Sequence, residues 1–233
     1  MFNFNVHELA LRMKIAQDQG AIATREKVHD PIADLIQEAI NAACTIFVQQ
    51  GRKNWTGSGF HLGKGYVATA SHVVPPQLKG SGAQITLTFD GQSMYPAELI
   101  ISDPNIDSGI IFNPQIAQLA PFVKLADSNK AQIGDIVAVI SSPEGWHDTA
   151  TVGRISNIHQ SMGQQAPTPA WNDIIFIDAD ILEGSSGGMC IGTDGFVYGS
   201  IMGVTGQRAN IGIGERSICP SYKILKLLES IQK

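Results

Sequence analysis

Three residues far apart in the sequence, His72, Asp107 and Ser186, are of the types that together perform acyl transfer. A serine hydroxyl is a weak nucleophile near neutral pH, and it becomes reactive when a neighbouring imidazole takes its proton. The imidazole in turn needs a carboxylate that fixes its tautomer and orientation. The sequence therefore offers a candidate nucleophile, base and orienting group in the chain order His, Asp, Ser.

The residues around the first two candidates indicate how they are positioned. His72 follows a pair of short strand-like runs joined by a turn, which contain Gly57-Ser58-Gly59-Phe60 and Gly65-Tyr66-Val67-Ala68-Thr69. Asp107 stands at the start of the apolar run Ser108-Gly109-Ile110-Ile111. A carboxylate there can face His72 away from water. Taken singly, His72 could also be a structural core or surface residue, and Asp107 could be a turn or cap residue.

Ser186 lies in the segment Gly184-Ser185-Ser186-Gly187-Gly188. Alone, such a segment is most often a loop. Its glycines can adopt the tight backbone conformations that bring amide N–H groups together on one point.

In order and in flanking residues, the three motifs resemble those of the chymotrypsin-like (trypsin-fold) serine proteases. The order His72, Asp107, Ser186 excludes the α/β-hydrolase and subtilisin interpretations, because those folds carry the triad in other orders. The resemblance implies that Ser186 is the nucleophile, His72 the base and Asp107 its orienting group. It also implies an oxyanion hole at Gly184, Ser185 and Ser186, with the N–H groups of Gly184 and Ser186 as donors.

Within that superfamily the chain most resembles the HtrA (Deg)-like bacterial peptidases, on the segments Ile140-Ser141-Ser142-Pro143-Glu144-Gly145, Thr149–Ser156 and Ile177-Asp178-Ala179-Asp180-Ile181. Between the last helix-like segment and Lys233 there is no room for a PDZ domain, so none is expected. Glu183 and Met189 stand where HtrA enzymes often carry prolines, which alters the rim of the site.

Asp180 lies six positions before Ser186, where trypsin-like enzymes carry the aspartate at the base of the S1 pocket. By resemblance, Asp180, Met202 and Gly203 would then line S1, and cleavage would follow Arg or Lys. A carboxylate at the floor of a closed pocket stabilises a cation only by pairing with it. The alternative is that Asp180 points outward or binds a loop amide, since HtrA-like pockets usually accept small aliphatic residues.

Trypsin zymogens mature when a new N-terminal amine pairs with the aspartate just before the nucleophile. Here Ser185 holds that position and carries no charge. We therefore expect the oxyanion loop to be ordered intrinsically, or by a partner, an oligomer contact or substrate.

The expected fold class is all-β: two packed six-stranded antiparallel barrels with N-terminal helices and a C-terminal helix. Many short β-rich runs separated by turn residues support it. The predicted divisions are an N-terminal helical segment (1–42), a first barrel with His72 and Asp107 (43–120), and a second barrel with Ser186 (121–233). Helical spacing at 6–16 and after Asp30-Pro31 predicts the two N-terminal helices, which are expected to pack on the first barrel or to mediate homo-oligomer or activating-partner contacts.

Composition limits the partners. The 233 residues carry a formal net charge of −5 and no basic run, which argues against nucleic acid. No stretch is long enough to span a membrane, and the start lacks the pattern of a secretory signal. Three cysteines, Cys44, Cys190 and Cys219, cannot all pair. Together these features predict a cytoplasmic protein.

The sequence therefore predicts a serine endopeptidase that needs no metal or organic cofactor and cleaves specific protein or peptide substrates by limited processing. One alternative is a latent protease or peptide-binding pseudoprotease-like module that needs a partner for activation. An esterase on the same fold is another, because acyl-enzyme chemistry is common to both.

Overall fold

A computed structural model of the protein describes residues 30–161, 168–205 and 215–231. Residues Ile32–Lys233 belong to one unit. The helix expected at 6–16 lies outside the described residues.

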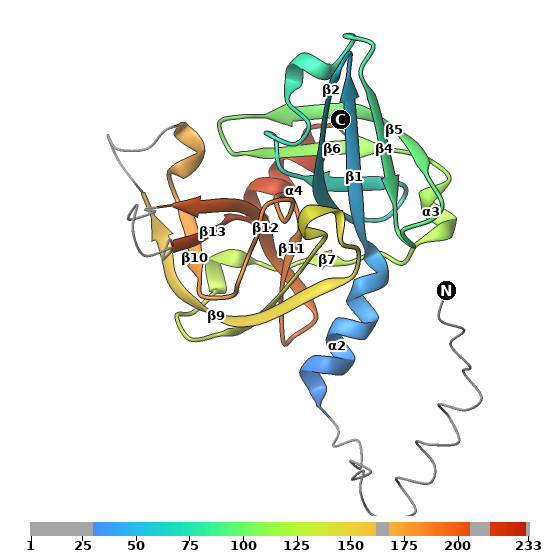
Figure 1. Cartoon of the computed structure of the whole chain (residues 1–233). Coiled ribbons are helices and arrows are strands. Elements are labelled where there is room, and N and C mark those ends of the chain that lie inside the picture. Colours follow the sequence, from blue (N-terminus) through green and yellow to red (C-terminus); the bar gives the residue numbers. More distant parts are fainter. Residues whose placement is uncertain (1–29, 162–167, 206–214, 232–233) are drawn as a thin grey trace, which may run out of the picture. The chain divides into compact units, whose positions relative to one another are not determined.

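The first barrel is closed by six antiparallel strands in the order β1-β2-β3-β6-β5-β4 (Figure 1). Its residues suit the element: β1 carries the β-branched and aromatic run Thr45-Ile46-Phe47-Val48, which packs well on a pleated surface. The strands are β1 (Ala43–Gln50), β2 (Lys53–His61), β3 (Tyr66–Thr69), β4 (Gln84–Thr88), β5 (Tyr95–Asp103) and β6 (Ser108–Phe112).

The second barrel follows the order β11-β8-β9-β10-β13-β12, and an antiparallel pairing between β11 and β12 closes it. A two-residue strand, β7, adds in parallel to β12. This confirms the predicted class of two six-stranded antiparallel barrels. The strands are β7 (Lys124–Leu125), β8 (Ile136–Ser141), β9 (Thr149–Gln160), β10 (Ile174–Ile177), β11 (Met189–Gly192), β12 (Phe196–Thr205) and β13 (Glu215–Pro220).

Three α-helices are described: α2 (Pro31–Ala39), α3 (Ile116–Leu119) and α4 (Ser221–Ser230). The second predicted N-terminal helix and the C-terminal helix are thus confirmed. Pro31 begins α2, where a missing N–H costs nothing. Short 3₁₀ turns lie at Ile40–Ala42, Pro76–Leu78, Ser128–Lys130, Pro143–Gly145 and Pro169–Trp171. None of the helices in the described residues has the length and apolar character needed to cross a bilayer.

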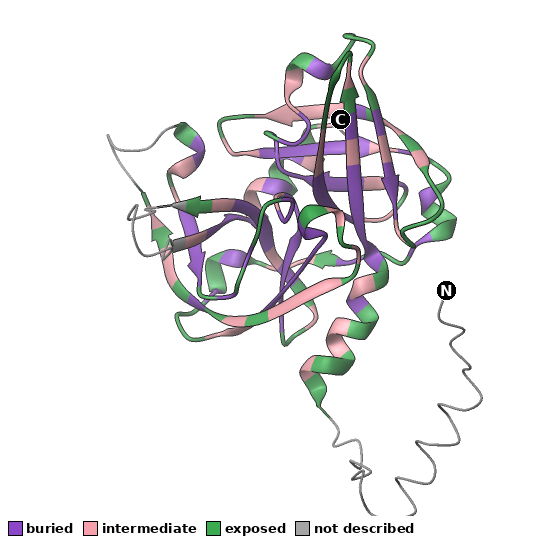
Figure 2. Ribbon diagram, in the orientation of Figure 1, coloured by how far each residue is buried: buried purple, intermediate pink, exposed green. Residues whose placement is uncertain are grey.

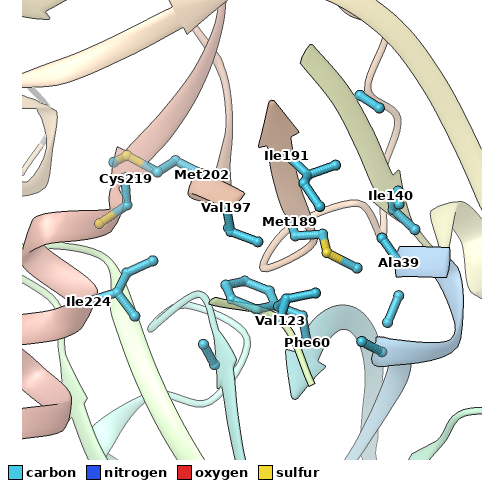
Figure 3. Close-up of a cluster of buried hydrophobic side chains, with 14 of the residues drawn as sticks. Ala39, Phe60, Val123, Ile140, Met189, Ile191, Val197, Met202, Cys219 and Ile224 are labelled. Atoms are coloured by element: carbon cyan, nitrogen blue, oxygen red, sulfur yellow. The ribbon is translucent and has the colours of Figure 1, made fainter. Parts of the chain in front are cut away.

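Each barrel has its own apolar interior, and a third cluster joins the two (Figures 2 and 3). That shared cluster brings Phe60 of the first barrel together with Met189 and Val197 of the second, and with Ile224 of α4. Leu35 of α2 packs against the same cluster. The helix was expected to pack on the first barrel, but it packs on a core to which both barrels contribute. Because the catalytic candidates are divided between the barrels, this cluster fixes their relative positions.

Candidate active site

The first barrel positions His72 and Asp107 at the same end of two paired strands. β3 ends at Thr69, just before the turn that carries His72, and β6 begins at Ser108, directly after Asp107. The antiparallel register places Thr69 opposite Gly109. The strand pairing alone therefore brings the two side chains together across 35 positions of sequence.

Asp107 holds both the backbone and the ring of His72. Its Oδ1 accepts hydrogen bonds from the His72 backbone N–H at 3.0 Å and from Nδ1 at 3.0 Å, and its Oδ2 lies 2.9 Å from Nδ1. The side chain of Asp107 is 13% exposed and that of His72 is 49% exposed. When Nδ1 carries the proton donated to the carboxylate, Nε2 is left as the proton acceptor.

Gly109 of β6 packs closely against the segment that follows His72. A Cβ at Gly109 would lie 2.7 Å from Cγ2 of Val74, a buried residue two positions after His72. The close approach of β6 to this segment therefore positions the turn that carries His72.

The second barrel supplies Ser186 in the turn before β11, and Gly187 lets that turn approach the first barrel. Gly187 has a φ of +84°, and a Cβ there would overlap Ser58 O, Thr69 Oγ1 and the Ala70 backbone N. Only a glycine permits this contact without strain. In addition, the Ser58 N–H donates to Ser186 O at 2.8 Å. The serine loop therefore packs directly against the strand ends that precede His72.

Ser186 Oγ makes no hydrogen bond with His72 or with any other described residue. Catalytic hydrogen bonds are often long before substrate binds and shorten in the reactive complex. The structure thus unites His72 with Asp107 through hydrogen bonds and unites both with Ser186 through backbone packing.

Two peptide units around Ser186 are oriented by their carbonyl groups. Glu183 O accepts from Glu144 N–H at 2.8 Å, and Ser185 O accepts from Gly188 N–H at 2.9 Å. Because a trans peptide directs its N–H opposite to its carbonyl, the N–H groups of Gly184 and Ser186 point away from these partners. Neither N–H has an acceptor among the described residues. Two free donors near a serine can stabilise an oxyanion.

Buried serines hold this loop in place. Ser58 Oγ donates to Gly184 O at 2.7 Å and accepts from Ser142 N–H at 2.8 Å, so one hydroxyl joins the serine loop to the loop after β8. Ser185 Oγ accepts from Leu182 N–H at 3.2 Å and from Ser141 Oγ at 3.2 Å.

The predicted role of Ser185 was in the oxyanion hole, but its own N–H donates to Leu182 O. Its side chain instead braces the loop. Sequence reasoning missed Ser58 and Ser141; the signal for Ser58 was a polar residue between two glycines inside a strand.

The predicted S1 residues are only partly brought together. Asp180 has a side chain that is 76% exposed and forms an ion pair with Arg216, Oδ1 to Nη2 at 2.6 Å. Met202 and Gly203 line a hollow of about 590 Å³ together with His72, and Asp180 does not border it. The structure therefore separates the predicted S1 carboxylate from the other two predicted S1 residues.

The described residues offer neither a metal site nor a reactive thiol beside Ser186. Among the described residues, no group of three His, Cys, Asp or Glu side chains could hold a metal ion. Cys190, four positions after Ser186, is fully buried, and burial raises the pKa of its thiol to about 12. A thiol that stays protonated is a poor nucleophile.

Comparison with known families and proteins agrees with this geometry. The family model described as "Trypsin-like peptidase domain" matches residues 57–199. A probable periplasmic serine endoprotease, DegP-like, from Chlamydia pneumoniae is 35% identical over 167 residues, which are 71% of this chain and 32% of that protein. A probable periplasmic serine protease do/HhoA-like from Haemophilus influenzae is 28% identical over 77% of this chain and 38% of its own. The chain thus spans about a third of the length of such relatives.

Solved structures show the same fold. The HtrA-type protease AlgW with a tripeptide superposes with a TM-score of 0.72 and 26% identity, covering 85% of this chain and 62% of that one. A serine endoprotease from Yersinia pestis gives a TM-score of 0.71 with 23% identity over 88% of this chain and 68% of that one.

The expected cytoplasmic location is wrong, because similar proteins are named periplasmic serine proteases. The cysteine reasoning failed for a physical cause. Cys44, Cys190 and Cys219 are all free and buried in the cores, so they pack as small apolar side chains whatever the redox state of the compartment. A missing disulfide framework does not identify the compartment here.

Proposed function

This chain belongs to the trypsin-like peptidase family of serine proteases, and on that premise we propose that it is an HtrA/DegP-type serine endopeptidase with Ser186 as nucleophile, His72 as general base and Asp107 as the group that orients His72. The observation that carries the proposal is the Asp107 carboxylate, which binds both the backbone N–H and Nδ1 of His72. One carboxylate that binds both groups fixes the orientation of the ring, and a protonated Nδ1 leaves Nε2 as the proton acceptor.

The proposed reaction follows from these positions. Ser186 Oγ attacks the carbonyl carbon of the scissile peptide bond, and its proton passes to His72 Nε2. The negative charge that develops on the carbonyl oxygen is stabilised by the N–H groups of Gly184 and Ser186. His72 then donates the proton to the leaving amine, and the C–N bond breaks. In the second half of the reaction His72 takes a proton from water, the resulting hydroxide attacks the Ser186 acyl ester, and His72 returns the proton to Ser186 Oγ as the acid is released.

Digestion of a diverse peptide mixture, with products identified by mass spectrometry, tests this proposal. The wild-type protein is expected to cleave internal peptide bonds, whereas Ser186→Ala is expected to leave the mixture intact. Cleavage that persists in Ser186→Ala would contradict the proposal. Retention of uncleaved peptides by both proteins would favour the alternative of a peptide-binding module, and hydrolysis of esters alone would favour an esterase.

The predicted preference for Arg or Lys before the scissile bond receives no support from the surroundings of Asp180. Its carboxylate already pairs with Arg216. A substrate cation would have to displace the Arg216 guanidinium, whose planar shape suits the same carboxylate oxygens. We propose that this pairing holds Asp180 away from the hollow lined by Met202 and Gly203, and that Arg216 suppresses the preference in this way.

Two further proposals concern the setting in which the protein works. We propose that the protein works in the periplasm, as the similar DegP-like proteases are named to do. We also propose limited processing of specific proteins, with homo-oligomer or activating-partner contacts made through the N-terminal helices. Cell fractionation tests the first, and cross-linking in cells tests the second.

A further inference from the structure

A pocket of about 630 Å³ borders the oxyanion loop, and we name it the oxyanion-side pocket. Gly184, whose N–H is the proposed oxyanion donor, lines it together with its neighbour Glu183. The 3₁₀ turn at Pro143–Gly145, which packs on β2, contributes Glu144. A substrate carbonyl bound at Gly184 therefore places the adjoining residues within reach of this pocket, because three extended residues span about 10 Å.

The wall opposite the oxyanion loop comes from the first barrel and combines uncharged polar side chains with an apolar part. Phe47 of β1, Trp55 of β2 and Met94, in the segment before β5, all line the pocket. Trp55 is fixed because its indole N–H donates to Val73 O at 2.8 Å. Met94 is 50% exposed and forms an unbranched, adaptable surface. Such a wall suits the aliphatic stem of a long side chain.

The charged side chains of the pocket are all acidic. Among the residues that line it, the only charged side chains are those of Glu144 and Glu183, and both residues are exposed. Neither carboxylate has an ion pair within the described part of the chain. Asp180, by contrast, is already paired with Arg216. Unpaired negative charge is therefore available to a substrate at this pocket.

We propose that the oxyanion-side pocket receives a Lys or Arg side chain of the polypeptide substrate, one to three residues from the scissile bond. The aliphatic stem lies on Phe47, Trp55 and Met94, and the cationic group meets Glu144 and Glu183. Long basic side chains are well matched to such a site, since they pack their stems on apolar surface and keep the charge near water. An acidic side chain would be repelled. This inference rests on the proposed function, because it assigns a specificity to the same active site.

Cleavage kinetics provide the first test. Internally quenched peptides that carry Lys, Arg, norleucine or Glu at each position flanking the scissile bond are compared by kcat/KM. We expect Lys or Arg at one position to be favoured over norleucine by about fivefold, as for exposed charge pairs. The preference should fall to near unity in the double variant Glu144→Gln, Glu183→Gln, and it should weaken between low and high salt.

The matched control is Glu229→Gln on α4, which makes the same charge change at an exposed position away from the pocket. It is expected to keep the full preference for Lys or Arg. A second variant, Met94→Ser, removes part of the apolar wall and is expected to reduce kcat/KM for norleucine and lysine peptides alike. A wild-type protein without any preference, or a preference that survives in the double glutamate variant, would overturn the proposal.

Binding to the Ser186→Ala protein separates failure of this inference from failure of the proposed function. Intrinsic tryptophan fluorescence or calorimetry is used to compare lysine and norleucine peptides. Tighter binding of the lysine peptide that is lost in the glutamate double variant supports the pocket even if the wild type cleaves nothing. Cleavage by the wild type, with equal affinity for both peptides, overturns the pocket and leaves the peptidase function standing.

Discussion

The two halves of the candidate site are held by different kinds of hydrogen bond. In the first barrel a charged group does the positioning, since the Asp107 carboxylate binds the N–H and the ring of His72. In the second barrel the Ser186 loop is held by backbone groups and by the neutral hydroxyls of Ser58 and Ser185. The comparison teaches that, among the described residues, hydrogen bonds of neutral groups hold the Ser186 loop, which carries Ser185 where trypsin zymogens need an aspartate.

The largest expected effect comes from the charged half. Asp107→Asn keeps the shape of the side chain but removes the charge and disturbs the tautomer of His72, so kcat should fall by about 10⁴-fold. Asp103→Asn, a nearby aspartate at the end of β5, is the control and should lose far less. A loss below tenfold for Asp107→Asn would contradict the role assigned to this pair.

The neutral half is tested by Gly184→Ala. Gly184 has a φ of +88°, and a Cβ there would lie 2.7 Å from Glu144 N and 3.0 Å from Ser142 O. The displaced peptide unit should lower kcat by about 10²–10³-fold, the usual effect of losing one oxyanion donor. Gly134→Ala has a similarly positive φ of +97° with nothing within 4 Å of the added atom. Equal activity losses in the two variants would show that backbone strain alone explains the result.

A smaller effect is expected for Ser58→Ala, which removes the hydroxyl that joins Gly184 O to Ser142 N–H. The loss should cost about 1–3 kcal/mol of unfolding free energy, because two buried polar groups lose their partner. We also expect kcat to fall by about tenfold, with KM nearly unchanged, if the loop shifts away from its oxyanion-binding form. Chemical denaturation and steady-state kinetics measure the two effects. A stability loss with unchanged kcat would mean that Ser58 supports the fold and not the loop.

The smallest effect is expected at Arg216, which pairs with the Asp180 carboxylate. Arg216→Gly releases the Asp180 carboxylate, so kcat/KM for peptides with Arg or Lys before the scissile bond should rise by about fivefold relative to alanine peptides. Competition between the two peptide types, followed by mass spectrometry, measures the ratio. A ratio that stays at the wild-type value would exclude Arg216 as the group that suppresses this preference.

Much of the first-barrel half was predictable, because its signal is local. His72 lies just beyond a strand end and Asp107 at a strand start, and an antiparallel pair brings such positions together. The second-barrel half was predictable only in part. Ser186 was marked by its glycines, but the hydroxyl of Ser58 meets Gly184 across 126 positions of sequence, and no local pattern reports such a contact.

Asp180 shows that substrate specificity, too, is predicted only in part from local sequence. Its distance from Ser186 in sequence suggested an S1 aspartate, yet Arg216 stands 36 positions further along the chain and takes the charge. Only the pairing of remote segments decides whether a carboxylate is available. The pair Glu144 and Glu183 shows the converse, because two carboxylates without a sequence motif converge on one pocket.

Labelling with a fluorophosphonate probe, read by intact mass, tests most directly the central claim that Ser186 is activated in the isolated protein. Wild-type protein, Ser186→Ala and His72→Ala are treated in parallel without any partner or proteolytic processing. A single adduct on the wild type, and none on either variant, is the predicted result. An unlabelled wild type, or an adduct on Ser186→Ala, would contradict the account.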